Sequence, residues 1–368
     1  MAEDGGVRVL ARPVVPAPRL PLDLHAQVDA HLELAARLPP EPPRFPRRLL
    51  TVEIPALLVA VLIAAAGFLM YGGPPGTGDL YVDPTTAAAR QVAEWEGAGR
   101  AADATLLRQI ADRPVPLWLA GGTDVAAVVA DYTDRADAAG AVPLLVAYNI
   151  PDRDCGSFSG GGAADGAAYR AWVAEVAAGL RGQRDPLVVL EPDAIPHQLT
   201  GCVTGADERY ALLAHAVDVL AAAGARVYLD AGNPGFVPDV GATADALARS
   251  GVRRAAGFSL NVANFYPTEE TVAHGTAISQ ALGGGVRFVV DTSRNGAGRA
   301  PEAADGTPSW CNPAGRRLGV PPTTDPGIPL VDALLWVKRP GESDGECRPG
   351  EPPAGGWFPE YALELVEG

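Results

Sequence analysis

The feature that most constrains the fold of this chain is an alternation, from residue 79 onward, between short apolar runs and longer alanine-rich segments. The runs are largely apolar, as in a parallel strand that is buried on both faces, and the alanine-rich segments have the length of helices. The candidate strands are residues 79–82, 115–120, 142–148, 186–190, 226–229, 256–260, 286–290 and 332–337. The candidate helices include residues 86–97, 124–139, 167–180, 208–223 and 268–282. Repeated βα units predict an α/β fold with one domain, a distorted (β/α) TIM-like barrel of parallel strands.

An uninterrupted apolar segment precedes this domain. Residues 54–71 contain no charged side chain and reach the lower end of the length that crosses a bilayer as a helix. A buried core helix is the alternative, but it would carry a polar face that this segment lacks. Because Arg47 and Arg48 lie just before the segment, the positive-inside rule puts the preceding residues in the cytoplasm and the following ones outside. We therefore expect one transmembrane helix, which makes the membrane a partner through residues 54–71.

The flanking segments complete this domain organisation. Residues 1–48 are rich in proline and carry mixed charge, which predicts a flexible cytoplasmic arm. Residues 49–71 then form an uncleaved signal anchor, residues 72–78 a glycine- and proline-rich linker, and residues 79–368 an extracellular domain. A cleaved signal peptide is the alternative, because residues 64–67 resemble a cleavage site, and the domain would then be secreted.

The charge of the chain argues against one class of partner. Lysine and arginine total 29 and aspartate and glutamate 44, so the formal net charge is -15. An acidic surface repels phosphate backbones, and we expect no nucleic-acid partner.

All four cysteines lie beyond the apolar segment. An even number of exported cysteines predicts two disulfides, and the spacing alone leaves three pairings open. A zinc site is the competing interpretation. It is weak, because no two cysteines lie within four residues of each other and the five histidines do not cluster with them.

Carboxylates gather where the predicted strands end. Because the carboxyl ends of barrel strands share one face, these side chains should surround a common site. A single aspartate there is ordinarily a helix N-cap. The whole set, accompanied by Tyr, Trp and Asn and without metal-binding histidines, is typical of a site that binds a neutral polyhydroxylated ligand and uses a paired acid and base. The carboxylates are Asp154, Glu191, Asp193, Asp230, Asp291, Glu342 and Asp344.

At these residues the sequence resembles glycoside hydrolase family 6, the cellulases that cleave β-1,4-glucan with inversion. The resemblance runs from Leu80 to about Leu365. It is carried by a series of blocks in the family's order: VAYNIPDRDCGSFSGGG (146–162), VVLEPDAI (188–195), VYLDAG (227–232), GFSLNVANF (257–265), FVVDTSRNG (288–296), WCNPAGR (310–316) and WVKRPGESDG (336–345).

The resemblance implies roles at the cleavage point. Asp193 corresponds to the general acid, which must hold a proton at the working pH in order to donate it to the departing glycosidic oxygen. Asp154 corresponds to a nearby carboxylate whose charge disfavours ionisation of Asp193. Tyr148 corresponds to the tyrosine that crowds the sugar and favours a distorted ring. Asp344 corresponds to the residue proposed as the catalytic base, with a proton relay through water as the alternative.

The resemblance also implies contacts with glucan. Trp118 and Trp310 correspond to platforms on which sugar rings stack, with core packing as the alternative for each. Lys338 and Glu342 correspond to groups that bind glucose hydroxyls, and Asp230 to an acid needed for activity or binding. The full expected substrate-binding set is Asp230, Trp118, Asn261, Asn264, Trp310, Lys338, Glu342, Asn233 and Phe236.

Two positions depart from the family pattern. Asn233 stands where the family has a histidine, and Phe236 where it has a stacking tryptophan. These departures predict weaker affinity on the leaving-group side of the cleavage point, or a preferred glucan other than crystalline cellulose.

Together these observations predict inverting hydrolysis of β-1,4-glucosidic bonds in a glucan oligosaccharide or polysaccharide. No metal or organic cofactor is expected, because two carboxylates and water suffice. The segments after Asp154 and Asp344 are short, which favours an open groove and endo action. An exo-acting cellobiohydrolase is the near alternative, and a surface glucan-binding protein without catalysis is the other. The resemblance pairs the cysteines as Cys155 with Cys202 and Cys311 with Cys347.

Overall fold

The computed structural model describes residues 79–180, 182 and 185–368. The arm, signal anchor and linker predicted over residues 1–78 lie outside the described residues. Within the described part of the chain, none of the helices combines the length and the apolar character needed to cross a bilayer.

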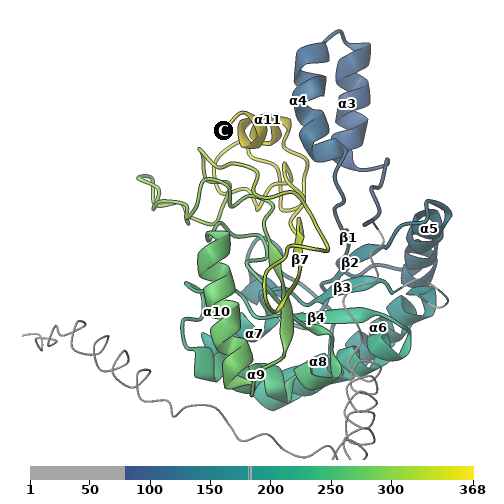
Figure 1. The fold of residues 1–368 in the computed structure, drawn as a ribbon, viewed down its shortest axis with the longest axis vertical. Coiled ribbons are helices and arrows are strands. Elements are labelled where there is room, and N and C mark those ends of the chain that lie inside the picture. The colour runs from purple at the N-terminus through teal and green to yellow at the C-terminus, as the bar shows by residue number, and fades with distance from the viewer. Residues whose placement is uncertain (1–78, 181, 183–184) are drawn as a thin grey trace, which may run out of the picture. The chain divides into compact units, whose positions relative to one another are not determined.

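Seven parallel strands form one sheet in which the spatial order follows the chain (Figure 1). The strands are β1 (Leu117–Leu119), β2 (Leu144–Ala147), β3 (Leu187–Leu190), β4 (Arg226–Asp230), β5 (Gly257–Leu260), β6 (Arg287–Asp291) and β7 (Val331–Leu335). The register is regular from β2 to β4, with Leu145 beside Val188 and Val188 beside Val227. The predicted alternation of strands and helices is thus confirmed.

The sheet curls but does not close into a complete barrel. Strands β1 and β7 are its two edges. The indole Nε1 of Trp118 in β1 donates a hydrogen bond of 2.9 Å to the Val337 carbonyl just beyond β7, and this contact joins the two edges. The expected strand over residues 79–82 contributes only a bridge between Leu80 and Val142. The distorted barrel of parallel strands is therefore confirmed as a curled sheet of seven strands, and the separate strand expected over residues 79–82 is reduced to this bridge.

The strands are buried on both faces, as their composition predicts. In β2, Leu144 and Val146 belong to an inner core enclosed by the curled sheet, whereas Leu145 and Ala147 belong to the core between the sheet and the outer helices. Full burial of a leucine or valine side chain contributes about 1.5–3 kcal/mol relative to its exposure. This two-sided burial explains why the runs are apolar at most of their positions.

The helices that connect successive strands cover the outer face of the sheet, and those before β1 and after β7 pack together around a core of their own (Figure 1). They are α3 (Ala87–Gly97), α4 (Ala101–Ala111), α5 (Val125–Ala138), α6 (Gly166–Leu180), α7 (Ala194–Leu199), α8 (Ala206–Ala222), α9 (Val240–Arg249), α10 (Thr268–Ala281) and α11 (Pro359–Glu367), with short 3-10 turns at η1 (Asp154–Gly156) and η2 (Val252–Arg254). Four of these, α4, α7, α9 and α11, were not among the helices expected from the sequence.

Two features of the helices shape the domain. Helices α3 and α4 form a hairpin that packs with α11 around Trp95, Leu107 and Trp336, a core separate from that of the barrel. Helices α5 and α6 approach closely at Gly179, where a Cβ atom would lie 2.6 Å from the Ala126 carbonyl oxygen. The carboxyl ends of the strands remain free of these helices and carry the loops described next.

Candidate active site

A groove of about 1020 Å³ lies at the carboxyl ends of the strands. Most of the predicted site residues line it: Trp118, Tyr148, Asp154, Asp193, Asn233, Phe236, Asn264, Trp310, Lys338, Glu342 and Asp344. Asp230 and Asn261 do not, and their exposures are 1% and 0%. The strand-end polar residues therefore fall into two groups, one beneath the groove and one facing it.

Glu191, just after β3, supports the backbone beneath the groove. Its carboxylate is fully buried and accepts hydrogen bonds from the amide of Asn149 at 3.0 and 2.9 Å and from that of Ile150 at 2.9 Å. These residues follow Tyr148, so Glu191 fixes the chain that carries the tyrosine. Burial raises the pKa of Glu191 to about 7, against the opposing effect of the amide hydrogen bonds and of Arg209.

Asp230, the last residue of β4, supports the next loop in the same way. Its Oδ2 accepts hydrogen bonds from the amides of Asp193 at 2.9 Å and Gly232 at 3.2 Å, and its Oδ1 accepts one from the Ser259 hydroxyl at 3.1 Å. Burial raises the pKa of Asp230 to about 6. Asp230 thus holds the backbone of Asp193 from below the groove.

Asp291, the last residue of β6, joins the loops on both sides of its strand. Its Oδ2 accepts hydrogen bonds from the amides of Ala263 at 3.0 Å and Lys338 at 2.9 Å, and its Oδ1 accepts one from the amide of Ser293 at 2.8 Å. Buried strand-end carboxylates at β3, β4 and β6 therefore organise the loops by binding backbone N–H groups.

Asn261 belongs to the same framework. Its Nδ2 donates to the carbonyl oxygens of Asp291 at 2.9 Å and Tyr266 at 3.2 Å, and its Oδ1 accepts from the Tyr266 amide at 3.1 Å. Its amide group is thus occupied by backbone, with no free edge toward the groove. Asn264 does line the groove, and its Oδ1 accepts a hydrogen bond from the Phe265 amide at 2.9 Å.

Asp193 faces the groove, half-buried, with its backbone in the left-handed region at φ 66°. This conformation turns the side chain away from the direction of β3. Burial raises the pKa of Asp193 well above its usual value, and the charges of Asp230 and Asp154 raise it further. A carboxyl in this environment keeps its proton at a pH at which an exposed aspartate has lost it. This is the property required of a general acid.

Asp154 also faces the groove from a left-handed backbone, at φ 55°. Its Oδ2 accepts a hydrogen bond of 2.7 Å from the Ser159 amide, which folds the loop over the carboxylate. Burial raises the pKa of Asp154, against the effects of that hydrogen bond and of the Arg153 charge. Asp154 and Asp193 therefore form a pair in which ionisation of one disfavours ionisation of the other.

Tyr148 and Trp118 form an aromatic corner beside these carboxylates. Their rings meet edge to face, with centroids 5.5 Å apart and an interplanar angle of 88°. The guanidinium of Arg153 lies 4.8 Å from the centre of the tyrosine ring. Burial and the negative charges of Asp193 and Asp154 raise the pKa of the Tyr148 hydroxyl, so this group stays a neutral donor.

Asp344 is held as an anion by two cations. Its carboxylate binds the Arg294 guanidinium at 2.7 and 3.0 Å and the Lys338 ammonium at 3.1 Å, and it accepts a hydrogen bond of 3.1 Å from the Asn312 amide. Burial favours the neutral acid, but these cations outweigh it and the pKa of Asp344 is lowered. Asp193 and Asp344 are therefore driven in opposite directions, one toward the acid and the other toward the carboxylate.

The neighbouring charges complete this side of the groove. Lys338 also donates from Nζ to the Ser343 carbonyl at 2.9 Å. Glu342 pairs with Arg339 at 3.0 Å, and burial raises the pKa of its carboxyl. Lys338 and Glu342 thus present polar atoms to the groove from fixed positions.

The structure forms two disulfides, and they are the pairs that the resemblance implies. Cys155 bonds to Cys202, which ties the loop that carries Asp154 to the segment after α7. Cys311 bonds to Cys347, which ties the loop that carries Asp344 to the preceding segment. Each bridge therefore anchors a loop that bears a groove-facing carboxylate.

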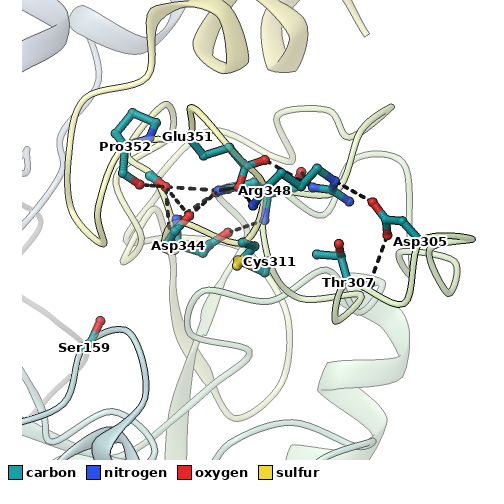
Figure 2. The surroundings of a disulfide bond; sticks show 12 residues. Ser159, Asp305, Thr307, Cys311, Asp344, Arg348, Glu351 and Pro352 are labelled. Atoms are coloured by element: carbon teal, nitrogen blue, oxygen red, sulfur yellow. Dashed lines mark hydrogen bonds and ion pairs between the residues drawn. A yellow bond between two sulfur atoms is a disulfide. The ribbon is translucent and has the colours of Figure 1, made fainter.

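Arg348 braces the second of these loops from outside. It pairs with Asp305 at 2.9 Å and with Glu351 at 3.2 Å, and Figure 2 shows these side chains around Cys311. Partly exposed pairs of this kind contribute little individually. Together with the disulfide they join three stretches of irregular chain.

The loops after β4 and β5 build the other half of the groove. The Phe236 ring meets the His197 ring edge-on, with centroids 5.5 Å apart. The Oδ1 of Asn233 accepts from the amides of Gly235 at 3.0 Å and Phe236 at 2.9 Å, so this side chain shapes a turn. Tyr266 lies against Gly235, where a Cβ atom would come within 1.6 Å of the tyrosine Oη.

The loops after β2 and β7 touch each other. The Phe158 ring packs on Gly345, where a Cβ atom would lie 2.4 Å from it, and meets Trp310 edge-on at 6.1 Å. Trp310 is 39% exposed and Phe158 46% exposed, so both rings present a face to solvent. Trp310 is therefore available for stacking and is not a core residue.

Some residues of the site had no role in the sequence prediction: Glu191, Asp291, Arg294, His197 and Tyr266. The first two were visible as strand-end carboxylates. No pattern in the sequence distinguishes the others from ordinary helix and loop residues.

Two clusters in the described part of the chain bring three possible metal-ligand atoms within 4.8 Å of one another: Cys155 with His197 and Cys202, and Cys311 with Cys347 and Glu351. Each cluster contains both cysteines of a disulfide. Because metals bind the thiolate form of cysteine, these clusters offer no complete metal site in the disulfide-bonded protein.

Comparison with known proteins supplies close relatives. Endoglucanase A from Cellulomonas fimi is 46% identical over 296 residues, which are 80% of this chain and 62% of that protein. The chain thus spans less than two thirds of the length of the Cellulomonas protein. Endoglucanase 1 from Streptomyces halstedii is 41% identical over 303 residues, 79% of this chain and 89% of that protein.

Solved structures share the fold. The endoglucanase Cel6 from Mycobacterium tuberculosis, in complex with methyl-cellobiosyl-4-deoxy-4-thio-β-D-cellobioside, is 43% identical with a TM-score of 0.72 over 80% of this chain and 99% of that one. Endoglucanase CEL6B from Humicola insolens is 26% identical with a TM-score of 0.68, over 79% and 96% of the two chains. The family model described as Glycosyl hydrolases family 6 matches residues 76–368. By sequence and by fold, this chain belongs to glycosyl hydrolase family 6.

Proposed function

We propose that this chain is an inverting β-1,4-glucanase that hydrolyses cellulose or a related β-glucan, with Asp193 as the general acid. The observation that carries the proposal is the environment of Asp193, a groove-facing carboxyl whose proton is retained by burial and by the charges of Asp230 and Asp154. The names of the Cellulomonas and Streptomyces relatives support the substrate class.

In the proposed reaction Asp193 gives its proton to the glycosidic oxygen as the bond from this oxygen to the anomeric carbon breaks. Positive charge then develops on the sugar ring. The carboxylate of Asp154 stabilises that charge. Loss of the Asp193 proton puts a negative charge beside Asp154 and Asp230, and this repulsion favours the return of a proton to Asp193 after the reaction. Tyr148 and Trp118 pack against the ring at this point.

Water attacks the anomeric carbon from the opposite face, which inverts its configuration. Asp344 is the proposed acceptor of the water proton, directly or through a second water. Its pairing with Arg294 and Lys338 supports this role, because it keeps the carboxylate ionised over the pH range between the lowered pKa of Asp344 and the raised pKa of Asp193. The acid and the base are thus both in their working forms over the same pH range.

Endo action is the proposed mode. The relatives at 41% and 46% identity are named endoglucanases. One observation favours exo action instead: Phe158 joins the loops after β2 and β7, and a glucan beneath joined loops would be held from its end. Parting of these loops would leave the groove open to internal bonds.

We also propose that the domain works in an oxidising compartment outside the cytoplasm, a proposal supported by the two disulfides. Attachment to a membrane through residues 54–71 stays a prediction, because these residues lie outside the described ones.

The test is hydrolysis of cellohexaose by the purified full-length protein, with product anomers followed by proton NMR beside Asp193→Asn. The proposal expects α-anomers from the wild type, and a loss of about 10²–10⁴ in kcat for the variant. Release of β-anomers would contradict inversion. For the mode of action, carboxymethyl-cellulose should lose viscosity long before much reducing sugar appears, and a parallel time course would favour exo action.

A further inference from the structure

His197 lies one helical turn beyond Asp193, on α7. Its amide donates to the Asp193 carbonyl at 2.8 Å, and its side chain lines the groove. The rise of an α-helix puts the two residues about 6 Å apart along the axis. Because both residues line the same groove, a sugar whose glycosidic oxygen reaches Asp193 can extend toward His197.

The surroundings of His197 determine where its proton lies. Burial and the charge of Arg209 lower the pKa of His197 to about 4, so the ring is neutral at higher pH and carries one N–H. Nδ1 is buried and has no hydrogen-bond partner among the described residues. An N–H enclosed without an acceptor is costly, so the proton belongs on Nε2.

Phe236 and Asn233 of the β4 loop lie beside His197 in the groove. Phe236 offers an apolar ring edge-on to the imidazole at 5.5 Å. The Oδ1 of Asn233 is used by the turn that carries Phe236. The β4 loop can approach α7 this closely because residue 232 is glycine, where a Cβ atom would lie 2.7 Å from the Pro196 side chain.

We propose that His197 is a substrate-binding residue whose Nε2–H donates a hydrogen bond to a hydroxyl of the glucose unit that departs with the Asp193 proton. The inference rests on the proposed function. The departing sugar packs on Phe236, and His197 fixes its rotation on that ring. A platform of phenylalanine and histidine thus recognises the leaving-group glucose.

The test compares two substrates that differ on the leaving-group side. Cellohexaose is cleaved between two sugars, whereas β-cellotriosyl fluoride releases fluoride and puts no glucose beside His197. In His197→Leu, kcat/KM for cellohexaose should fall about threefold to tenfold, the range of one neutral hydrogen bond, and kcat/KM for the fluoride should stay within about twofold of wild type. His197→Gln, which restores an N–H donor at similar reach, should recover most of the loss on cellohexaose.

Several outcomes would overturn the inference. Equal loss on both substrates would mean that His197 acts through the fold of the groove and not through the leaving-group glucose, and no loss on cellohexaose would mean that no hydrogen bond forms. A Gln variant as impaired as the Leu variant would point to ring packing. Thermal unfolding of each variant checks folding, and His197→Met replaces the Leu variant if the latter does not fold. Wild-type protein that cleaves neither substrate would instead refute the proposed function.

Discussion

Replacement of Arg294 by Met tests how the anionic form of Asp344 is maintained. Arg294 is fully buried, binds Asp344 at 2.7 and 3.0 Å, and donates to the Ala263 carbonyl at 2.7 Å. Removal of one member of a buried ion pair costs about 3–5 kcal/mol, because the other charge stays buried. Lys338 remains 3.1 Å from Asp344 as a second partner. We therefore expect the lower end of that range, about 3 kcal/mol of unfolding free energy.

Calorimetry can measure this loss. An unfolding entropy of about 2.1 cal/mol/K per residue amounts to about 0.6 kcal/mol/K for a domain of about 290 residues, so the melting temperature should fall by about 5 °C near neutral pH. The pKa of Asp344 is lowered in the folded protein, so the pairing stabilises wild type above the usual aspartate pKa and is lost as pH falls through the folded value. In Arg294→Met the carboxyl should take up a proton at higher pH. The difference between variant and wild type should therefore be smaller at about pH 4 than at about pH 7.

The double variant Arg294→Met with Asp344→Asn is the matched control. It removes both charges, so it should melt closer to wild type than Arg294→Met does. An equal loss at both pH values, with no recovery in the double variant, would refute the electrostatic reasoning. The stability would then depend on packing of the Arg294 guanidinium, which lies 4.5 Å from the centre of the Phe265 ring.

Three further predictions concern single residues. Asp154→Asn removes a charge that raises the pKa of Asp193, so the alkaline limb of the pH profile of kcat/KM for cellohexaose should move to lower pH. A shift to higher pH would contradict the repulsion between Asp154 and Asp193. Trp118→Phe removes the indole hydrogen bond to Val337 that joins the two edges of the sheet. A loss of about 1 kcal/mol of unfolding free energy should lower the melting temperature by about 2 °C. An unchanged melting temperature would mean that this bond adds nothing to stability. The pKa of Glu191 is raised to about 7, so between the usual glutamate pKa and 7 the folded protein keeps a proton that the unfolded chain has lost. Wild type should therefore lose up to about 3 kcal/mol of stability as pH rises through this range. Glu191→Gln should flatten this dependence in melts from pH 5 to 7.5, whereas an identical slope would contradict it.

The strands were predictable because their environment leaves a local signal. A strand buried on both faces, such as β2 with Leu144 and Leu145 on opposite sides, needs apolar residues at every position. No local sequence pattern indicates whether the sheet closes into a complete barrel. The sequence of residues 79–82 predicts a strand, but only the bridge between Leu80 and Val142 forms there. A strand also needs neighbouring strands whose backbone groups are free to pair with it.

The candidate site was predictable as a face and as a set of residue types. The role of each residue, as a support of the loops or as a group that faces the groove, was not predictable. Glu191 and Asp193 are two residues apart in one motif, yet Glu191 is enclosed and binds the Asn149 amide, whereas Asp193 faces the groove. Asp230 and Asn261 support the loops from beneath, a role that the sequence did not indicate, and their expected contact with substrate stays a prediction.

The sequence by itself determined the parallel α/β fold, the family and the carboxylates at the strand ends, because apolar runs and motif residues are local properties of the chain. Only the tertiary structure decided which carboxylate keeps its proton and which stays charged. A pKa depends on the charges and the burial that other segments bring, as Asp230 and Asp154 do for Asp193, and Arg294 does for Asp344. Those neighbours lie far from each other in the chain and meet only when the strands align their carboxyl ends.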